Sequence, residues 1–395
     1  MKKLWTLFWE MFKIALFVVG GGFAILAVAD DVFAKKLKWT ENGEIAMHLP
    51  VFQMVPGIIA GATAVYVGRK VAGIPGAVAA VCGVFLPSVI VFSAVSAGYA
   101  MIPFGNRFLD AAFLGLRAAL SGIIAAMIVK SWKKCIAGSV PMFILVFAVV
   151  AIGVLKVNPA LVVAVAAGFG VALKFAQTGG VSPGAGGVSP GTGGVSPRKF
   201  RASVWALPLV FMKYGSIAFG GGYVLVPVYI ADFVGKAAPF LQLSGREFAD
   251  VMALTQMTPG PIAVNCATFF GYRMGLESFG NLAGALGCAV AATVCLLLPG
   301  TVLLYIALNS LEKFKTSRIV QGLLSGVKPV TVAMMLNALW AFLSMSAWTV
   351  SEGGAVCWHP VAAALAAACA AATLSGRVGV VKQIFASAAI SAALA

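Results

Sequence analysis

Hydrophobic positions follow one another along most of this chain in long, uninterrupted runs, and polar positions are confined to short stretches between them. Six such runs precede residue 177, near residues 4–34, 45–68, 74–102, 108–129, 135–155 and 157–173, and a similar series follows residue 203. Each run is long enough to span, or nearly span, a hydrocarbon core. Because the strands of a membrane barrel would alternate polar and apolar positions, the pattern predicts an all-α integral membrane protein with about 10–12 transmembrane or re-entrant helices.

Composition agrees with this pattern. The 395 residues are 61% hydrophobic and 10% charged, with a mean hydropathy of +1.00, far above that of a soluble domain. The apolar sequence after Lys2 and Lys3 continues past Gly20 without a small-residue cleavage site, so we expect the first helix to be retained. The prediction is a multi-pass protein of the bacterial cytoplasmic (inner) membrane, with the lipid bilayer as its surroundings.

The net charge of +16 does not indicate a nucleic-acid partner, because the basic residues are scattered at helix ends. Retention of Lys and Arg on the cytoplasmic side explains most of them. The seven cysteines lie mostly inside apolar runs and form no CxxC pair, so we interpret them as buried thiols and expect no metal.

A flexible linker divides the chain. Residues 177–197 read QTGGVSPGAGGVSPGTGGVSP, a Gly/Ser/Pro unit written nearly three times, which has no apolar surface to bury and cannot cross lipid. We therefore predict a first membrane repeat over residues 1–176, a linker over 177–200 and a second membrane repeat over 201–395.

The two halves share a set of short motifs in the same order and at nearly the same spacing. In the first half these are Phe12-Lys13, Gly20-Gly21-Gly22-Phe23, Gln53-Met54-Val55-Pro56-Gly57, Gly68-Arg69-Lys70 and Leu86-Pro87-Ser88. In the second half they are Met212-Lys213, Gly220-Gly221-Gly222-Tyr223, Gln256-Met257-Thr258-Pro259-Gly260, Gly271-Tyr272-Arg273 and Leu298-Pro299-Gly300. The match indicates an internal duplication.

Charge suggests that the two copies are inverted in the membrane. The helix near 108–130 has Lys130, Lys133 and Lys134 at its C-terminal end, whereas its counterpart near 318–345 has its basic residues at the N-terminal end, at Lys313, Lys315 and Arg318. Inverted repeats are a common plan of secondary transporters. Since the linker cannot cross, inversion requires one broken segment of the first half to be re-entrant.

The glycine triplets and the Pro-Gly pairs predict broken helices. Three adjacent glycines cost a helix roughly 2–3 kcal/mol relative to alanine, and prolines remove backbone donors. A half-helix that restarts after such a break presents free amides and a positive dipole end, which together bind anions. Thr258 is a candidate N-cap at the sharpest break. The alternative is that the glycines only permit close packing and the prolines only kink. The candidate positions are Gly20, Gly21, Gly22, Pro56, Gly57, Gly220, Gly221, Gly222, Thr258, Pro259, Gly260 and Pro261.

Cations within the apolar runs also favour an anionic solute. Lys13 and Lys213 each lie seven residues before a glycine triplet, and Arg117 and Lys328 occupy equivalent places. Each would be costly facing lipid, so we expect them to face the interior, with snorkelling to the interface as the alternative. Neutral hydrogen bonds are expected from Gln53, Gln256 and Asn265. Acidic residues are few and cluster toward segment ends, at Asp30, Asp31, Glu44, Asp232, Glu247 and Asp250.

An enzyme is not indicated. The sequence contains neither GxGD nor HExxH nor a Walker A motif, and its two histidines, His48 and His359, belong to no such motif. We therefore expect no catalytic residue and no cofactor.

The motifs of the second half resemble the long-chain form of the chromate ion transporter family. They are Phe219-Gly220-Gly221-Gly222, Gln256-Met257-Thr258-Pro259-Gly260-Pro261 and Ala267-Thr268-Phe269-Phe270-Gly271-Tyr272-Arg273. The resemblance covers roughly residues 8–130 and 205–345. In the first half Val19 and Ile58 stand where the second has Phe219 and Pro261, so that copy of the site is degenerate or differently used.

The resemblance implies transport of an oxyanion such as chromate, with sulfate as a similar dianion. We expect alternating access around a site at the interface of the halves, lined by the break residues, Gln256, Asn265 and the four cations. An anion channel, or a carrier for another inorganic or small organic anion, is the alternative. The expected partners are the oxyanion and the bilayer; homodimer formation, the coupling ion and the direction of transport are left open.

Overall fold

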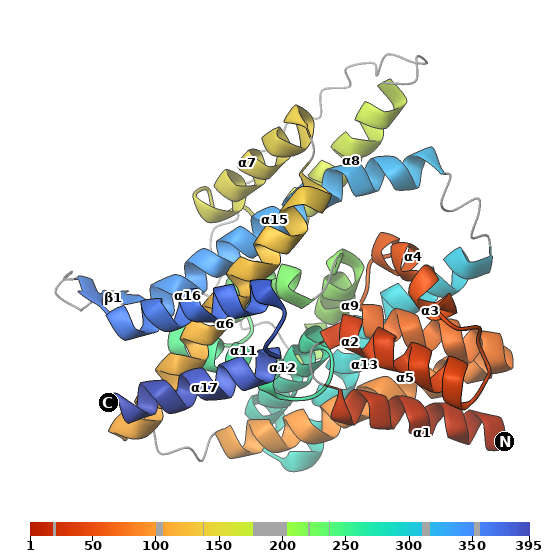
Figure 1. Ribbon diagram of the computed structural model, residues 1–395, viewed down its shortest axis with the longest axis horizontal. Coiled ribbons are helices and arrows are strands. Elements are labelled where there is room, and N and C mark those ends of the chain that lie inside the picture. Colours follow the sequence, from red (N-terminus) through yellow and green to blue (C-terminus); the bar gives the residue numbers. More distant parts are fainter. Residues whose placement is uncertain are drawn as a thin grey trace.

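The computed structural model of the chain is a bundle of helices (Figure 1). It describes residues 1–18, 21–99, 106–136, 138–176, 204–219, 222–236, 238–309, 317–350 and 356–395. Within this part of the chain the only named strands are β1 (Trp348–Val350) and β2 (Val356–Trp358), a short antiparallel pair. The prediction of an all-α architecture is confirmed. The predicted linker lies outside the described residues, together with Gly20, Gly220, Gly221, Lys313 and Lys315.

The first repeat begins with short helices and ends with long ones. Its elements are α1 (Lys2–Phe17), α2 (Gly21–Asp30), the π-helix η1 (Asp31–Lys36), α3 (Glu44–Met47), α4 (Leu49–Met54), α5 (Ile59–Tyr99), α6 (Arg107–Cys135), α7 (Ser139–Gly153) and α8 (Pro159–Ala176).

The second repeat follows the same order. Its elements are η2 (Val204–Ala206), α9 (Leu207–Ile217), η3 (Gly222–Leu225), α10 (Val226–Phe233), α11 (Gly245–Met257), α12 (Ile262–Phe279), α13 (Leu282–Asn309), α15 (Arg318–Ser346), β1, β2, α16 (Pro360–Ser375) and α17 (Val380–Ala393). By the shared motifs, α1 corresponds to α9, α5 corresponds to α12 and α13 together, and α6 corresponds to α15.

The glycine and proline breaks divide runs that composition alone presents as single spans. The run at 4–34 becomes α1 and α2, and the run at 45–68 becomes α3, α4 and the start of α5. The expectation of half-helices is confirmed at these places. The expectation that each apolar run forms one helix is wrong for both of them, because triple glycine and Pro-Gly interrupt the backbone hydrogen bonds.

Helix α5 is a hairpin of two helices and not one long rod. Ala72 and Gly73 leave the helical conformation, and Gly73 has φ +63°. Gly68 then lies against Gly76, where a Cβ on either residue would come within 2.3 Å of the other's backbone. The matching turn of the second repeat separates α12 from α13 and contains Gly280 with φ +66°. Glycine is needed at both turns because L-residues rarely adopt positive φ.

The two repeats are interlaced. The terminal helices of each repeat pack on the long helix of the other: α7 and α8 lie along α15, while α16 and α17 lie along α6 (Figure 1). Glycines allow these close approaches, since Gly326 faces the backbone of Ala166 and Gly122 faces the backbone of Ala366. Neither repeat therefore buries its surface alone.

The equivalent long helices run antiparallel. Ser121 of α6 has its Oγ 3.3 Å from that of Ser346 in α15, and the counterpart of Ser346 is Cys135, the last residue of α6. The middle of α6 thus contacts the end of α15, and the two helices run in opposite directions in Figure 1. This is the relation between equivalent helices that inverted repeats require.

Four described helices are long and apolar enough to cross a membrane, namely Ile59–Tyr99, Arg107–Trp132, Leu282–Asn309 and Arg318–Ser346. They form two equivalent pairs, one from each repeat. Shorter apolar helices accompany them, among them Ser139–Gly153 and Pro360–Ser375.

The described cysteine side chains carry free thiols. Cys266 and Cys369 are buried, but Cys82, Cys135, Cys288 and Cys295 are only partly covered. The prediction of buried thiols is wrong for these four, because neighbouring helices cover their side chains only in part.

Candidate functional site

Within each repeat, the glycine triplet packs against the start of the helix that follows the Pro-Gly pair. A Cβ placed on Gly22 would lie 2.9 Å from Ile59 Cβ and 3.2 Å from the Ala60 amide nitrogen. In the second repeat a Cβ on Gly222 would lie 2.9 Å from the Ala263 amide nitrogen. The end of each glycine triplet thus packs on the first turn of the helix that follows the Pro-Gly pair, where side chains larger than hydrogen have no room.

Each Pro-Gly break also touches the other repeat. Gly57 packs on Gly300 of α13, since a Cβ on Gly57 would lie 3.0 Å from the Gly300 Cα, while Gly260 packs on Ser88 of α5. Ser88 and Gly300 are equivalent residues of the Leu-Pro-Ser and Leu-Pro-Gly motifs. The breaks therefore converge at the interface of the halves, as the sequence predicts for a transport site.

The second break is surrounded by buried polar atoms that lack a partner. Ser88 Oγ, Asn265 Oδ1 and Gln256 Nε2 have no hydrogen-bond partner among the described residues, and these three residues are 0%, 0% and 6% exposed. A Cβ on Gly260 would lie 2.5 Å from Ser88 Oγ and 2.9 Å from Asn265 Oδ1. Orphaned buried polar atoms are costly and rare, so their clustering at one break points to a ligand.

Gln256 connects the two motifs of the second repeat. The Tyr223 hydroxyl, directly after the glycine triplet, donates to Gln256 Oε1 at 2.7 Å. This hydrogen bond fixes the amide so that its Nε2 donor is the atom left without an acceptor. In the first repeat Phe23 replaces the tyrosine, and Gln53 is exposed.

The first break is apolar and closed. Its cavity of about 10 Å³ is lined by residues such as Phe52, Ile58 and Leu304, and it holds at most one water. The Gly57 amide already donates to the Ala218 carbonyl at 3.0 Å. Ala62 stands where the second repeat has Asn265. Among the described residues the first break therefore has no buried, unpartnered side-chain atom of the kind found at the second.

Thr258 does not cap the following helix, so that prediction is wrong. Its hydroxyl donates to the Leu254 carbonyl one turn earlier, and Thr258 is the C-cap of α11. The N-cap of α12 is Pro261, which has no side-chain hydrogen bond. The amides of Ile262 and Ala263 make no hydrogen bond within the described part of the chain, which leaves the start of α12 as a set of free donors.

Lys13 and Lys213 are both neutralised by nearby carboxylates. Lys13 Nζ lies 2.9 Å from Glu10 Oε1, and Lys213 Nζ lies 3.3 Å from Asp232 Oδ2. Both lysine side chains remain more than a third exposed. The expectation that they supply unpaired interior charge is wrong, and snorkelling beside a carboxylate describes them better.

Arg117 is buried and joins the two repeats. Its Nε lies 2.5 Å from Asp250 Oδ1 and its Nη2 lies 3.0 Å from Asp250 Oδ2, while the Tyr99 hydroxyl donates to Oδ2 at 3.3 Å. The expectation of an interior Arg117 is confirmed. Lys328 differs, since its side chain is exposed. The first repeat has Met47 at the place equivalent to Asp250.

Acidic side chains enter the interior, contrary to the expectation that they stay at segment ends. Asp232 and Asp250 are 9% and 2% exposed, and both are compensated by a basic residue and a tyrosine hydroxyl. Asp232 is the last residue but one of α10, whereas Asp250 lies in the middle of α11.

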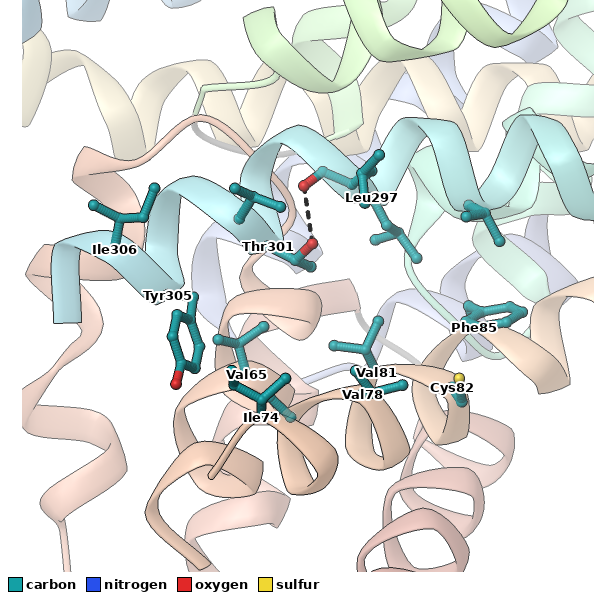
Figure 2. A pocket seen from close by; sticks show the side chains of 14 residues that line it. Val65, Ile74, Val78, Val81, Cys82, Phe85, Leu297, Thr301, Tyr305 and Ile306 are labelled. Carbon is teal, nitrogen blue, oxygen red and sulfur yellow. Dashed lines mark hydrogen bonds between the residues drawn. The ribbon is translucent and has the colours of Figure 1, made fainter. Parts of the chain in front are cut away.

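Two larger cavities flank the breaks. A polar one of about 600 Å³ adjoins the Arg117–Asp250 pair. An apolar one of about 450 Å³ separates α5 from α13, with Ile74 near Tyr305 and Ile306 at one end and Phe85 at the other (Figure 2). Leu297 and Thr301 separate this apolar groove from the first break, since they line both. Its lining carries no charged group and offers an oxyanion nothing to bind.

The sequence indicates the break residues but misses several partners. Ser88, Tyr99, Tyr223 and Asp250 each contribute a polar atom to these sites, and none stands out by motif alone. The equivalence of Ser88 and Gly300 in matching Leu-Pro motifs is the one signal that could have identified Ser88, because a polar residue replaces a glycine there.

The comparisons with known proteins agree with the motifs. The chain is 29% identical over 351 residues to a chromate transport protein of Pseudomonas aeruginosa, covering 83% of this chain and 78% of that protein. It is 25% identical over 284 residues to a chromate transport protein of Cupriavidus metallidurans, covering 70% and 67%. It is 23% identical over 363 residues to an uncharacterized transporter of Methanocaldococcus jannaschii, covering 87% and 86%.

No solved structure matches the chain. The sequence model of the chromate transporter family matches residues 5–171 and 205–392, which together make up most of the chain and correspond to the two interlaced repeats. With its paired membrane-spanning helices, this protein is a multi-pass membrane transporter that belongs to the chromate transporter family.

Proposed function

We propose that this chain is a secondary transporter that moves chromate, or a similar tetrahedral dianion such as sulfate, across the bacterial cytoplasmic membrane. The observation that carries the proposal is the cluster of buried, unpartnered polar atoms at the second Pro-Gly break. Two relatives named chromate transport protein support the choice of substrate, and sulfate has the same shape and charge.

The second break has the donors that an oxyanion needs. The Ser88 hydroxyl and the Gln256 amide each have a free hydrogen-bonding atom, and the amides of Ile262 and Ala263 begin α12. A helix N-terminus attracts negative charge. Asn265 would take part by rotating its amide, since its Nδ2 makes only long contacts of 3.4 Å to two carbonyls.

The first break is proposed to act as a contact about which the halves rock. Gly57 bonds to Ala218 and packs on Gly300, so two backbones from different repeats touch there without side chains between them. Alternating access in inverted-repeat transporters moves one repeat against the other around a fixed site. A site built from Ser88 of one repeat and Gln256 of the other opens when that interface opens.

Uptake of labelled chromate and sulfate into proteoliposomes tests this function. Liposomes that contain the wild-type protein should take up more labelled chromate than liposomes without protein, and unlabelled sulfate should reduce this uptake. Absence of uptake of either anion, in either direction of an imposed gradient, would contradict the proposal. Uptake of small organic acids in preference to both would favour the alternative carrier.

A further inference from the structure

The Arg117–Asp250 pair lies beside a polar cavity that is separate from the breaks. The cavity measures about 600 Å³, and its polar lining includes Tyr99, Asp110, Arg246, Glu247 and His359. Arg117 belongs to the first repeat and Asp250 to the second. Their ion pair therefore bridges the halves at the edge of a space large enough for an oxyanion.

Arg117 binds the Asp250 carboxylate through two N–H groups, in the way that a guanidinium binds a tetrahedral oxyanion. Nε and Nη2 contact the two carboxylate oxygens at 2.5 Å and 3.0 Å, and the side chains of Arg117 and Asp250 are 11% and 3% exposed. A guanidinium binds carboxylates and tetrahedral oxyanions through the same paired N–H groups. The Asp250 carboxylate thus occupies the Arg117 guanidinium, for which an entering oxyanion would compete.

The charge of the cavity bears on this competition. Its carboxylates are Asp110, Glu247 and Asp250, and its guanidinium groups are Arg117 and Arg246. A dianion that enters such a lining is repelled unless one carboxylate loses its charge. Glu247 is engaged in the capping box of α11, where its Oε2 accepts from the Ser244 amide at 2.7 Å. Asp250 is the carboxylate in direct contact with Arg117.

Arg246 supplies a first contact for the oxyanion. It is exposed at the cavity and has no ion-pair or hydrogen-bond partner among the described residues. It lies four residues before Asp250 on α11, which places both on one face of that helix. The same helix ends at the second break, so a movement of Asp250 away from Arg117 would be transmitted to Gln256.

We infer that this cavity is a second oxyanion site at which the substrate displaces Asp250 from Arg117, and that the released carboxylate takes up one proton from water. The proton is transferred to a carboxylate oxygen, which leaves a neutral acid beside the bound dianion. When the oxyanion departs, the proton returns to water and the ion pair reforms. The inference rests on the proposed oxyanion transport and adds a coupled proton to it.

Proteoliposomes with an enclosed pH indicator test the inference. Chromate uptake by the wild type should be accompanied by proton movement in the same direction, and Asp250→Asn should transport chromate with no proton movement and little dependence on pH. Asp31→Asn is the control, because it removes an exposed carboxylate that does not line this cavity, and it should keep both the uptake and the proton movement.

Three results would overturn the inference. The first is wild-type chromate uptake without proton movement, and the second is proton movement that persists in Asp250→Asn. The third concerns Arg246→Gln, which changes an exposed residue and should raise the KM for chromate about tenfold; an unchanged KM would remove the cavity from the substrate path. If Asp250→Asn does not fold, the wild-type and Arg246→Gln measurements decide. Failure of the wild type to transport any oxyanion would instead contradict the proposed function.

Discussion

The two Pro-Gly breaks descend from one motif, yet their surroundings differ. The second break has Ser88, Asn265 and Gln256 around it, all buried and each with an unpartnered polar atom. At the equivalent places the first break has Gly300, Ala62 and an exposed Gln53. The duplicated backbone has been kept in both copies, but the polar side chains have been kept only in one.

This difference separates two roles that the motif could have. A break that only lets helices pack closely needs glycine and proline, and the first break has just these together with an amide already bonded to Ala218. A break that binds an anion also needs polar groups left free, and among the described residues only the second break has unpartnered buried polar side chains around it. Matched substitutions in the two copies should therefore have unequal effects.

The largest effect is expected from replacing both prolines of the second break. Pro259→Ala with Pro261→Ala would let α11 and α12 form more continuous backbone hydrogen bonds and remove the free amides, so chromate transport should fall about 100-fold or more. Pro56→Ala is the control and should reduce transport much less. Vesicle uptake, normalised to the amount of protein in the membrane, measures both; undiminished uptake in the double variant would remove the second break from the site.

A large effect on stability is expected at Arg117. Arg117→Gln leaves the Asp250 carboxylate buried without its partner, which costs about 3–5 kcal/mol and should lower the temperature at which detergent-solubilised protein aggregates. Lys328→Gln, at the equivalent exposed place, should leave that temperature nearly unchanged. Chromate affinity of the two variants should follow the same order, and equal effects of both would show that the repeats use these cations alike.

An intermediate effect is expected at the two glutamines. Gln256→Ala removes a buried donor at the second break and should raise the KM for chromate about tenfold. Gln53→Ala changes an exposed side chain and should leave KM within about twofold. Initial rates of uptake at several chromate concentrations provide the measurement. A larger effect of Gln53→Ala than of Gln256→Ala would reverse the assignment of roles.

The smallest effect on transport is expected from inserting reporter domains that show on which side of the membrane a loop lies. Reporters placed after Lys134 and before Lys313 should both report the cytoplasmic side and leave uptake largely intact, because both positions adjoin the basic ends of equivalent helices. Opposite locations would contradict inversion, despite the antiparallel contact of Ser121 with Ser346.

Much of the fold can be predicted from the sequence because its signals are local. Apolar runs, triple glycine and Pro-Gly pairs predict helices and their interruptions, and the matching motifs predict two repeats. The hairpin turn at Ala72 and Gly73 is also predicted in this way, since it falls between the apolar runs at 45–68 and 74–102, just after Arg69 and Lys70. The exchange of terminal helices between repeats is hidden, because it depends on contacts between residues far apart in the sequence.

The candidate site was predictable in its backbone and less so in its side chains. The break residues follow from motif and chemistry, but pairing of Lys13 with Glu10 and of Arg117 with Asp250 depends on which helices become neighbours and how their side chains turn. The same holds for Ser88, which the other repeat brings to Gly260. Charges that look unpaired along a sequence are compensated in three dimensions, and the donors that remain free at the second break are neutral.

Equilibrium binding of chromate to purified protein tests most directly whether the second break, and not the first, holds the oxyanion. Asn265→Ala gives the second break the residue that the first already has at this place, Ala62. This variant should bind chromate about tenfold more weakly than the wild type, while Gln53→Ala should bind it as tightly. Unchanged affinity in Asn265→Ala together with weakened binding in Gln53→Ala would place the anion at the first break and contradict this assignment.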